Sequence, residues 1–80
     1  MISERLKQVI LRELELDDFD LRDDTRASEV PRWDSLAHVG ILSAVEAEFG
    51  IRLRALEVVR LHRVGDLQEL IDRKTGPAGA

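Results

Sequence analysis

The chain has 80 residues, of which 44% are hydrophobic and 35% are charged, and its formal net charge is −4. This length allows one modest hydrophobic core, and the acidic balance argues against nucleic acid as the main partner. Because the chain contains no cysteine, it has neither a disulfide framework nor a thiolate metal site. It has no apolar run long enough to span a membrane and no signal-peptide core near its N-terminus, so we expect a cytoplasmic protein without a membrane partner.

The N-terminal segment predicts a helix, because its apolar residues recur at the spacing of one helix face. Ser3 stands where it can cap the start of this helix. A long connection follows, from about Glu15 to Trp33; it is rich in aspartate, and Pro31 prevents a helix from running through it. Phe19 and Leu21 are expected to hold this loop on the core. The residues of the helix face are Ile2, Leu6, Val9, Ile10 and Leu14.

A second helix is predicted from Ser35 to Phe49, with Asp34 as its N-cap and Gly50 just after its end. The Asp34 carboxylate can accept the backbone N–H of Leu36 or Ala37, and its charge suits the positive end of the helix. On a helical wheel, one set of apolar residues clusters on one side and should form the buried face. That face consists of Val39, Leu42, Val45 and Phe49, with Ile41 at its edge.

The C-terminal part predicts two further helices. Residues 51–54 alternate between apolar and arginine side chains, but a lone strand has no partner here, so we expect an extended linker. A short third helix is predicted from Ala55 to Leu61, and a fourth ends before Gly76. The apolar face of the fourth helix consists of Val64, Leu67, Leu70 and Ile71. The predicted fold is therefore all-α: a small four-helix bundle with a long first loop and a short third helix, formed by one domain in residues 1–75 and followed by a flexible tail in residues 76–80.

Ser35 is the residue whose position suggests chemistry. It falls at the first position of the second helix, beside N–H groups without intrahelical partners, where an anion such as a phosphate is favoured. A serine at a helix start is also an ordinary structural residue. A hydrolase nucleophile fits poorly, because Asp34 is committed to the backbone, His38 follows on the same helix, and no Gly-x-Ser-x-Gly turn is present. His38 is therefore expected to be a solvated helix residue.

Charge is segregated along the chain. Residues 13–24 are acidic, whereas residues 52–63 contain four arginines and a single acidic residue, Glu57. Most such runs are solvated faces. The acidic run does not form a calcium loop, because Arg22 stands at the third ligand position and the required glycine does not follow. No metal site is predicted.

Two short sequences carry a family resemblance. Residues 33–39 read Trp-Asp-Ser-Leu-Ala-His-Val, and residues 46–51 read Glu-Ala-Glu-Phe-Gly-Ile. Both closely resemble the acyl carrier protein family, and the resemblance continues without a gap from about Asp34 to Ile71. In that family the serine of Asp-Ser-Leu carries 4′-phosphopantetheine, which is taken from coenzyme A. The resemblance therefore implies that Ser35 is the site of covalent attachment and that the chain is a non-catalytic carrier of thioester-bound acyl groups.

The resemblance also implies partners and surfaces. The expected partners are a phosphopantetheinyl transferase, an acyl-loading ligase or transferase and a downstream synthase, and the carrier itself is expected to be a monomer. Partner recognition is assigned to Asp34, Leu36, Gly40, Ser43, Ala47, Arg54, Arg60 and Arg63. An interior glycine is costly in a helix, so Gly40 indicates either close approach by a partner or drift at a tolerant position. An apolar interior that partly shelters the acyl chain is assigned to Val39, Leu42, Leu53, Leu56, Val59 and Leu61. The nearby arginines make a small or polar acyl group at least equally plausible.

The subclass is predicted from departures from the usual family patterns. Peptidyl carriers usually show Gly-Gly before x-Ser-Leu, and fatty-acid carriers usually show Gly-x-Asp-Ser-Leu with a more acidic second helix. The sequence Pro-Arg-Trp-Asp at residues 31–34 has neither form. It looks most like discrete carriers of specialised metabolism, such as polyketide biosynthesis, whose cargo is an acyl, aminoacyl or glyceryl group. The alternatives are an acyl carrier protein of fatty-acid synthesis and a carrier-like interaction module that is never modified.

Overall fold

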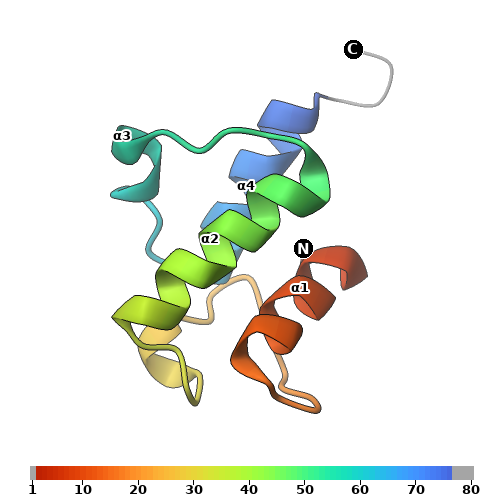
Figure 1. Ribbon diagram of the computed structural model, residues 1–80, viewed down its shortest axis with the longest axis vertical. Coiled ribbons are helices and arrows are strands. Elements are labelled where there is room, and N and C mark those ends of the chain that lie inside the picture. Colours follow the sequence, from red (N-terminus) through yellow and green to blue (C-terminus); the bar gives the residue numbers. More distant parts are fainter. Residues whose placement is uncertain (1, 77–80) are drawn as a thin grey trace.

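The computed structural model describes residues 2–76, and within that range the chain is all-helical, with no strand. In chain order it contains α1 (Glu4–Leu14), the 3₁₀ helix η1 (Ala27–Glu29), α2 (Ser35–Phe49), α3 (Ala55–Val58) and α4 (Val64–Thr75), as Figure 1 shows. The prediction of an all-α fold with four helices, a long first loop and a short third helix is confirmed. From residue 77 on, the predicted tail lies outside the described residues. No helix among the described residues has the length and apolar character needed to cross a membrane.

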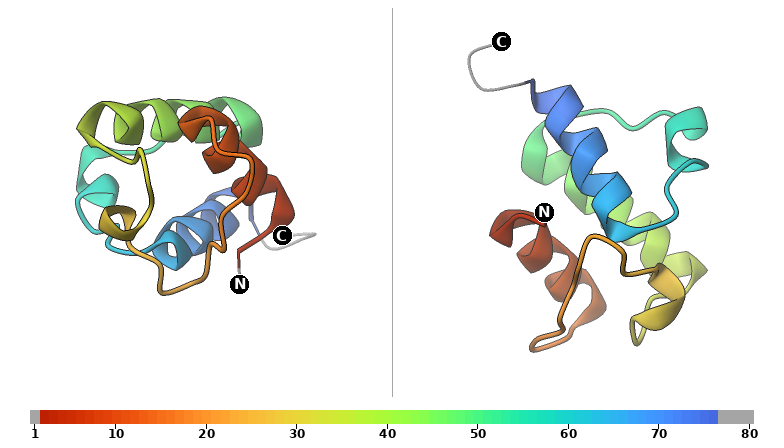
Figure 2. Two further views of the ribbon diagram at one scale, coloured as in Figure 1. Left: turned by 90° about the horizontal axis from the view of Figure 1, so that it is seen from below. Right: turned by 180° about the vertical axis from the view of Figure 1, so that it is seen from behind.

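The helices surround a single core. Seen from below, α1, α2 and α4 form three sides of the bundle, and α3 with η1 closes the fourth (Figure 2). The helix α1 begins where the Ser3 hydroxyl accepts the backbone N–H of Leu6 at 3.2 Å, which confirms the predicted cap. It ends at Glu15, whose left-handed backbone (φ 56°) turns the chain away. The core side chains contributed by α1 include Leu6 and Ile10, both fully buried.

The buried face of α2 differs from the predicted one. Ile41 and Val45 have no exposed surface, so Ile41 lies at the centre of the face and not at its edge. Val39 is 60% exposed, and its assignment to the buried face is wrong. Phe49 is only partly buried, and the guanidinium carbon of Arg5 lies 4.7 Å from the centre of its ring. The physical reason is that α2 carries apolar or small residues on most of its circumference, so periodicity does not single out one face.

The long first loop is tied to the start of α4. The backbone carbonyl of Thr25 accepts the N–H of Val64 at 2.8 Å, and that of Asp23 accepts the N–H of Gly65 at 2.9 Å. A Cβ atom on Gly65 would lie 2.6 Å from the Asp23 oxygen, so the approach requires glycine. Leu21 is buried as predicted. The loop therefore satisfies the first N–H groups of α4, which have no partners within the helix.

The C-terminal elements follow the prediction with one adjustment. The helix α3 covers Ala55–Val58 and is shorter than the predicted Ala55–Leu61. Residues 51–54 form an extended linker, as expected, and the N–H of Leu53 donates to the Glu46 carboxylate at 2.8 Å. At the other end of the bundle, the buried side chain of Gln68 accepts the backbone N–H of Ser3 at 2.9 Å. This bond joins α4 to the start of α1.

The helix phase of α2 gives a stability prediction. Ile41→Ala removes a fully buried side chain and is expected to lower the free energy of unfolding by about 2–5 kcal/mol. Val39→Ala, on the exposed side of the same helix, is expected to change it by less than about 0.5 kcal/mol. Chemical denaturation of both variants at one temperature measures the difference. Equal destabilisation by the two substitutions would show that this orientation of α2 is wrong.

Candidate functional site

Ser35 is the exposed first residue of α2. The preceding Asp34 has an extended backbone, and its carboxylate accepts the N–H of Ala37 at 2.8 Å. The predicted cap is therefore formed, with Ala37 and not Leu36 as the donor. The α2 axis places the positive end of the helix dipole beside the Ser35 hydroxyl. An anionic group on this oxygen would be stabilised there.

Arg32 ties the turn before Ser35 to the end of α1. Its backbone is left-handed (φ 69°), a conformation that residues other than glycine adopt at a cost. Its guanidinium donates to the Glu15 carbonyl at 3.1 Å and reaches the Leu14 carbonyl at 3.5 Å. These carbonyls lie at the C-terminal end of a helix, where a cation is favoured. The contact offsets part of the backbone strain and fixes the distance between α1 and the serine.

Trp33 ties the same turn to α2. Its indole Nε1–H donates to Nδ1 of His38 at 3.1 Å, and the two ring centres are 6.1 Å apart. His38 is half-buried, so the expectation that it is a solvated helix residue is wrong. An accepting Nδ1 places the proton of the neutral ring on Nε2. Sequence reasoning missed this pair, although an indole five residues before an imidazole at a helix start was a usable signal.

The interaction also bears on the nucleophile interpretation. The Asp34 carboxylate is occupied by the backbone of α2, and Nδ1 of His38 is occupied by Trp33. These contacts leave the three residues without an Asp–His–Ser relay, in which the carboxylate would bind the imidazole and the imidazole the hydroxyl. The site presents a serine hydroxyl, and within residues 2–76 no hydrogen bond joins it to a basic side chain.

The residues assigned to partner recognition on α2 do not share one environment. Leu36 is 82% exposed, and Ser43 and Ala47 are exposed as well. Gly40 is half-buried and faces α1, since a Cβ atom there would lie 2.9 Å from Oε1 of Glu13. The close approach inferred at this glycine is therefore made within the chain. The neighbouring atom is the end of a flexible side chain, which can move.

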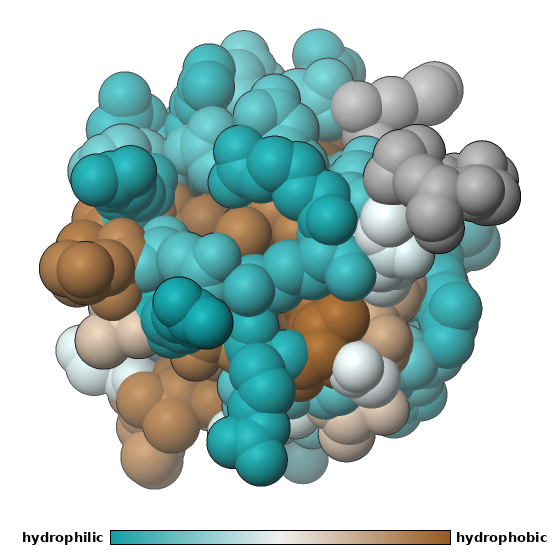
Figure 3. Space-filling model, turned by 90° about the horizontal axis from the view of Figure 1, so that it is seen from above, coloured by the Kyte–Doolittle hydropathy of each residue, from teal (hydrophilic) through white to brown (hydrophobic). Residues whose placement is uncertain are grey.

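The six side chains assigned to an acyl pocket are not brought together as an interior space. Val39, Leu56 and Val59 are exposed, whereas Leu42, Leu53 and Leu61 pack against the core. On the face seen from above, apolar surface gathers on the side where α3 lies (Figure 3). Of the six, only Leu61 lines the small apolar cavity of about 30 Å³ beside Trp33 and His38. That space is about the size of one water molecule.

The basic residues assigned to recognition lie around α3 and the start of α4. Arg54, Arg60 and Arg63 are exposed, and Arg63 forms an ion pair with Asp66 at 3.2 Å. The Asp66 carboxylate also accepts the backbone N–H of His62 and of Arg63. The N–H of His62, followed by the Arg63 contacts, holds the pKa of the Asp66 carboxyl below its usual range. No cluster of possible metal ligands is present among residues 2–76.

The fold and site together define a class of protein: a small helical bundle that presents one serine hydroxyl at the start of its second helix. A scan against models of known protein families finds no match. The chain is 25% identical over 75 residues to an acyl carrier protein of Solidesulfovibrio magneticus, covering 94% of this chain and 96% of that protein. The solution structure of a holo acyl carrier protein from Geobacter metallireducens matches it with a TM-score of 0.82 and 30% identity, over 86% of this chain and 79% of that one. The chain belongs to the acyl carrier protein family, whose members act as non-catalytic carriers.

The family pattern also explains Arg32. Fatty-acid members usually show Gly-x-Asp-Ser-Leu, and Arg32 occupies the position of that glycine. The backbone of Arg32 is left-handed, a conformation that glycine adopts without strain. The arginine side chain makes a contact with α1 that a glycine could not make.

A comparison of three variants separates strain from contact at Arg32. Arg32→Ala keeps the left-handed strain and loses the guanidinium, whereas Arg32→Gly loses both. We expect Arg32→Ala to lower the free energy of unfolding most, with the glycine variant about 1 kcal/mol more stable than the alanine variant. Urea denaturation measures the free energy of unfolding of each variant. Arg32→Lys shows how much of the stability lost in Arg32→Ala a single positive charge restores. If alanine were as stable as glycine at this position, the strained turn would not be present in solution.

Proposed function

We propose that this protein carries an acyl group as a thioester on a 4′-phosphopantetheine arm attached to Ser35. The observation that carries the proposal is the exposed Ser35 hydroxyl at the positive end of the 15-residue helix α2. The phosphodiester of the arm is an anion, and a helix N-terminus stabilises it. Because the chain has no cysteine, the thiol that forms the thioester comes from the arm.

The arm is attached by another protein. Asp34 and His38 are occupied by the α2 backbone and by Trp33, so a phosphopantetheinyl transferase supplies the metal and base that activate Ser35. The transferase takes the arm from coenzyme A. The carrier itself contributes a defined position for the serine and a high effective concentration of the tethered intermediate at each enzyme that it meets.

We assign the carrier to specialised metabolism, with an acyl-loading ligase or transferase and a downstream synthase as partners. Support comes from α2, where Ala37 and Gly40 stand at positions that are often acidic in fatty-acid carriers, although Glu46 and Glu48 remain. The arginines around α3 provide charge of the opposite sign. The two alternatives are a fatty-acid carrier and an interaction module that is never modified. The experiments below distinguish both from the proposed function.

Partner docking is assigned to the apolar residues nearest the serine. Leu36 is 82% exposed and Val39 is 60% exposed, so both offer apolar surface that water covers in the free protein. Arg54, Arg60 and Arg63 add charge that guides the encounter. Exposed apolar side chains beside a reactive position are typical contacts of a partner enzyme.

The site of modification is tested by intact mass. Incubation with coenzyme A and a promiscuous phosphopantetheinyl transferase is expected to add the mass of one phosphopantetheine to the wild-type protein. Ser35→Ala is expected to gain nothing, whereas Ser43→Ala, an exposed serine of the same helix, behaves as wild type. No mass gain by the wild type would support an unmodified module, and a gain by Ser35→Ala would place the arm elsewhere.

Docking is tested by loading kinetics with the cognate acyl-loading enzyme. Leu36→Ala is expected to lower kcat/KM for loading of the holo protein at least about fivefold, because apolar anchors commonly cost more than 1 kcal/mol on truncation. Leu56→Ala, an equally exposed leucine on α3, is the matched control and is expected to change the rate less. Equal loading rates for both variants would show that Leu36 is not part of the interface. Efficient use of the loaded carrier by a fatty-acid ketosynthase would contradict the assignment to specialised metabolism.

A further inference from the structure

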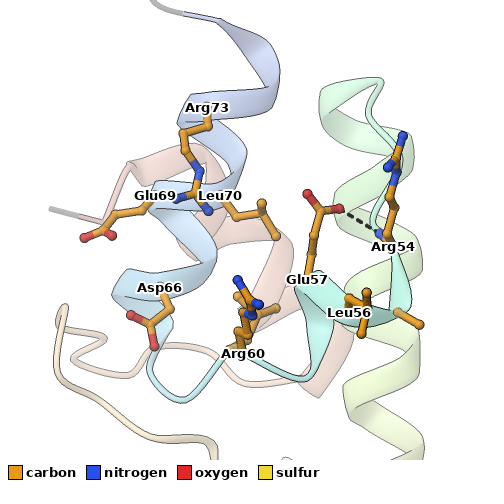
Figure 4. A pocket seen from close by; sticks show the side chains of 10 residues that line it. Arg54, Leu56, Glu57, Arg60, Asp66, Glu69, Leu70 and Arg73 are labelled. Carbon is orange, nitrogen blue, oxygen red and sulfur yellow. Dashed lines mark hydrogen bonds between the residues drawn. The ribbon is translucent and has the colours of Figure 1, made fainter.

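An open groove of about 750 Å³ runs between α3 and α4 (Figure 4). Leu61 and Leu70 line its apolar part, and Leu70 is buried beneath it. Arg60 from the α3 side and Arg73 from α4 line its polar part. Figure 4 shows that these two guanidinium groups point toward one another across the groove. The groove thus combines an apolar strip with two converging cations.

Neither of these cations forms an ion pair with another of the described residues. Among residues 2–76, no carboxylate lies within ion-pair distance of Arg60 or Arg73. Glu69 extends away from the groove in Figure 4. Two guanidinium groups without partners favour a planar anion that accepts two hydrogen bonds from each.

The remaining carboxylates at the groove are engaged elsewhere. The Glu57 carboxylate accepts the backbone N–H of Arg54 at 2.9 Å and pairs with Lys74 at 2.9 Å. Asp66 caps the start of α4 and is oriented away from Arg60 in Figure 4. The lining of the groove includes three arginines and three carboxylates, and within it Arg60 and Arg73 direct their guanidinium groups at one another.

The groove shares one lining residue with a small cavity near the start of α2. Leu61 lines both this groove and the small apolar cavity that Trp33 and His38 border. Trp33 and His38 flank the serine in sequence and lie at the start of α2. Leu61 is therefore the apolar residue that the groove shares with the cavity bordered by Trp33 and His38.

We propose that the α3–α4 groove binds the free carboxylate of an arm-tethered acyl group, so that the cargo is the half-thioester of a dicarboxylic acid. Arg60 and Arg73 hold the carboxylate, and the methylene groups lie along Leu61 and Leu70. Binding makes and breaks no covalent bond. This inference rests on the proposed function, because it requires the arm on Ser35, and it deepens that function by naming the chemical class of the cargo.

The test compares two acyl groups of equal length. A promiscuous transferase loads Ser35 from succinyl-coenzyme A or from butyryl-coenzyme A, and intact mass verifies each product. The readout is the side-chain Nε–Hε resonance of each arginine in ¹⁵N-labelled protein. We expect the succinyl group to shift the resonances of Arg60 and Arg73 and the butyryl group to leave them in place. Because the contact is ionic and exposed, the shift is expected to decrease at high salt.

Variants assign the shift to the groove. Arg60→Gln and Arg73→Gln are each expected to abolish the succinyl-dependent shift at the other arginine. Arg54→Gln is the matched control, because Figure 4 shows the Arg54 guanidinium directed away from Arg60 and Arg73. Identical shifts for succinyl and butyryl groups, or a succinyl shift that survives both substitutions, would overturn the proposal.

The mass measurement tests the proposed carrier function separately from binding in the groove. If Ser35 gains no mass in either reaction, the carrier function fails, whatever the groove binds. Titration of the unmodified protein with S-succinyl and S-butyryl pantetheine then applies the same readout to the groove. A shift caused only by the succinyl compound would show that the groove binds a carboxylate thioester even without the carrier function. The absence of such a shift would contradict the proposed binding site as well.

Discussion

The turn from Val30 to Asp34 is the element on which the rest of the site depends. It is attached on one side to the end of α1 through Arg32 and on the other side to the first turn of α2 through Trp33 and His38. Asp34 then caps α2, so the position of Ser35 is fixed relative to both helices. A single attachment would leave the turn free to pivot, whereas two attachments in different directions define its orientation.

This arrangement depends in turn on how α1 and α2 pack. Ile41 and Val45 fill the core against α1, and this orientation leaves Leu36 and Val39 on the outside. Exposing two large apolar side chains beside Ser35 gives up burial that would stabilise a domain with little stability to spare. The same orientation presents Gly40 to the end of the Glu13 side chain. The exposed apolar surface beside the serine is thus a consequence of the rotation of α2 about its axis, which the burial of Ile41 and Val45 fixes.

The sequence was sufficient to predict the start of α1 and both ends of α2, because these depend on local chemistry, whereas α3 ends earlier than predicted. Ser3 and Asp34 form the expected caps, and Gly50 ends α2 in a left-handed conformation (φ 65°). Spacing of apolar residues also predicted the faces of α1 and α4, which have polar opposite sides. It failed on α2, where apolar and small residues surround the helix and the placement of Ile41 and Val39 depends on packing against other helices.

Of the two contacts that were missed, the one made by Arg32 joins distant segments, whereas the Trp33–His38 hydrogen bond spans only five residues. Arg32 reaches carbonyls that lie 17 and 18 residues earlier in the chain, and no local pattern indicates such a bond. The strained backbone at Arg32 was visible only as a departure from the glycine of the usual family pattern. The orientation of His38 depends on where the turn places Trp33. Local rules located the serine, but the contacts that hold it arise from tertiary structure.

The distribution of charge follows from the use of carboxylates as backbone acceptors. Beyond α2, the linker and the starts of α3 and α4 lack partners for several N–H groups. Glu46, Glu57 and Asp66 supply these partners, and each carboxylate is thereby held close to the chain. Arg60 and Arg73 have no such role at the backbone, and their guanidinium groups face one another across the α3–α4 groove. The chain has a net charge of −4, yet among the described residues these two arginines have no carboxylate within ion-pair distance, and Glu57 and Asp66 nearby are held by backbone N–H groups. Local hydrogen-bond demand, and not net charge, therefore decides which charged groups at the groove stay available to a ligand.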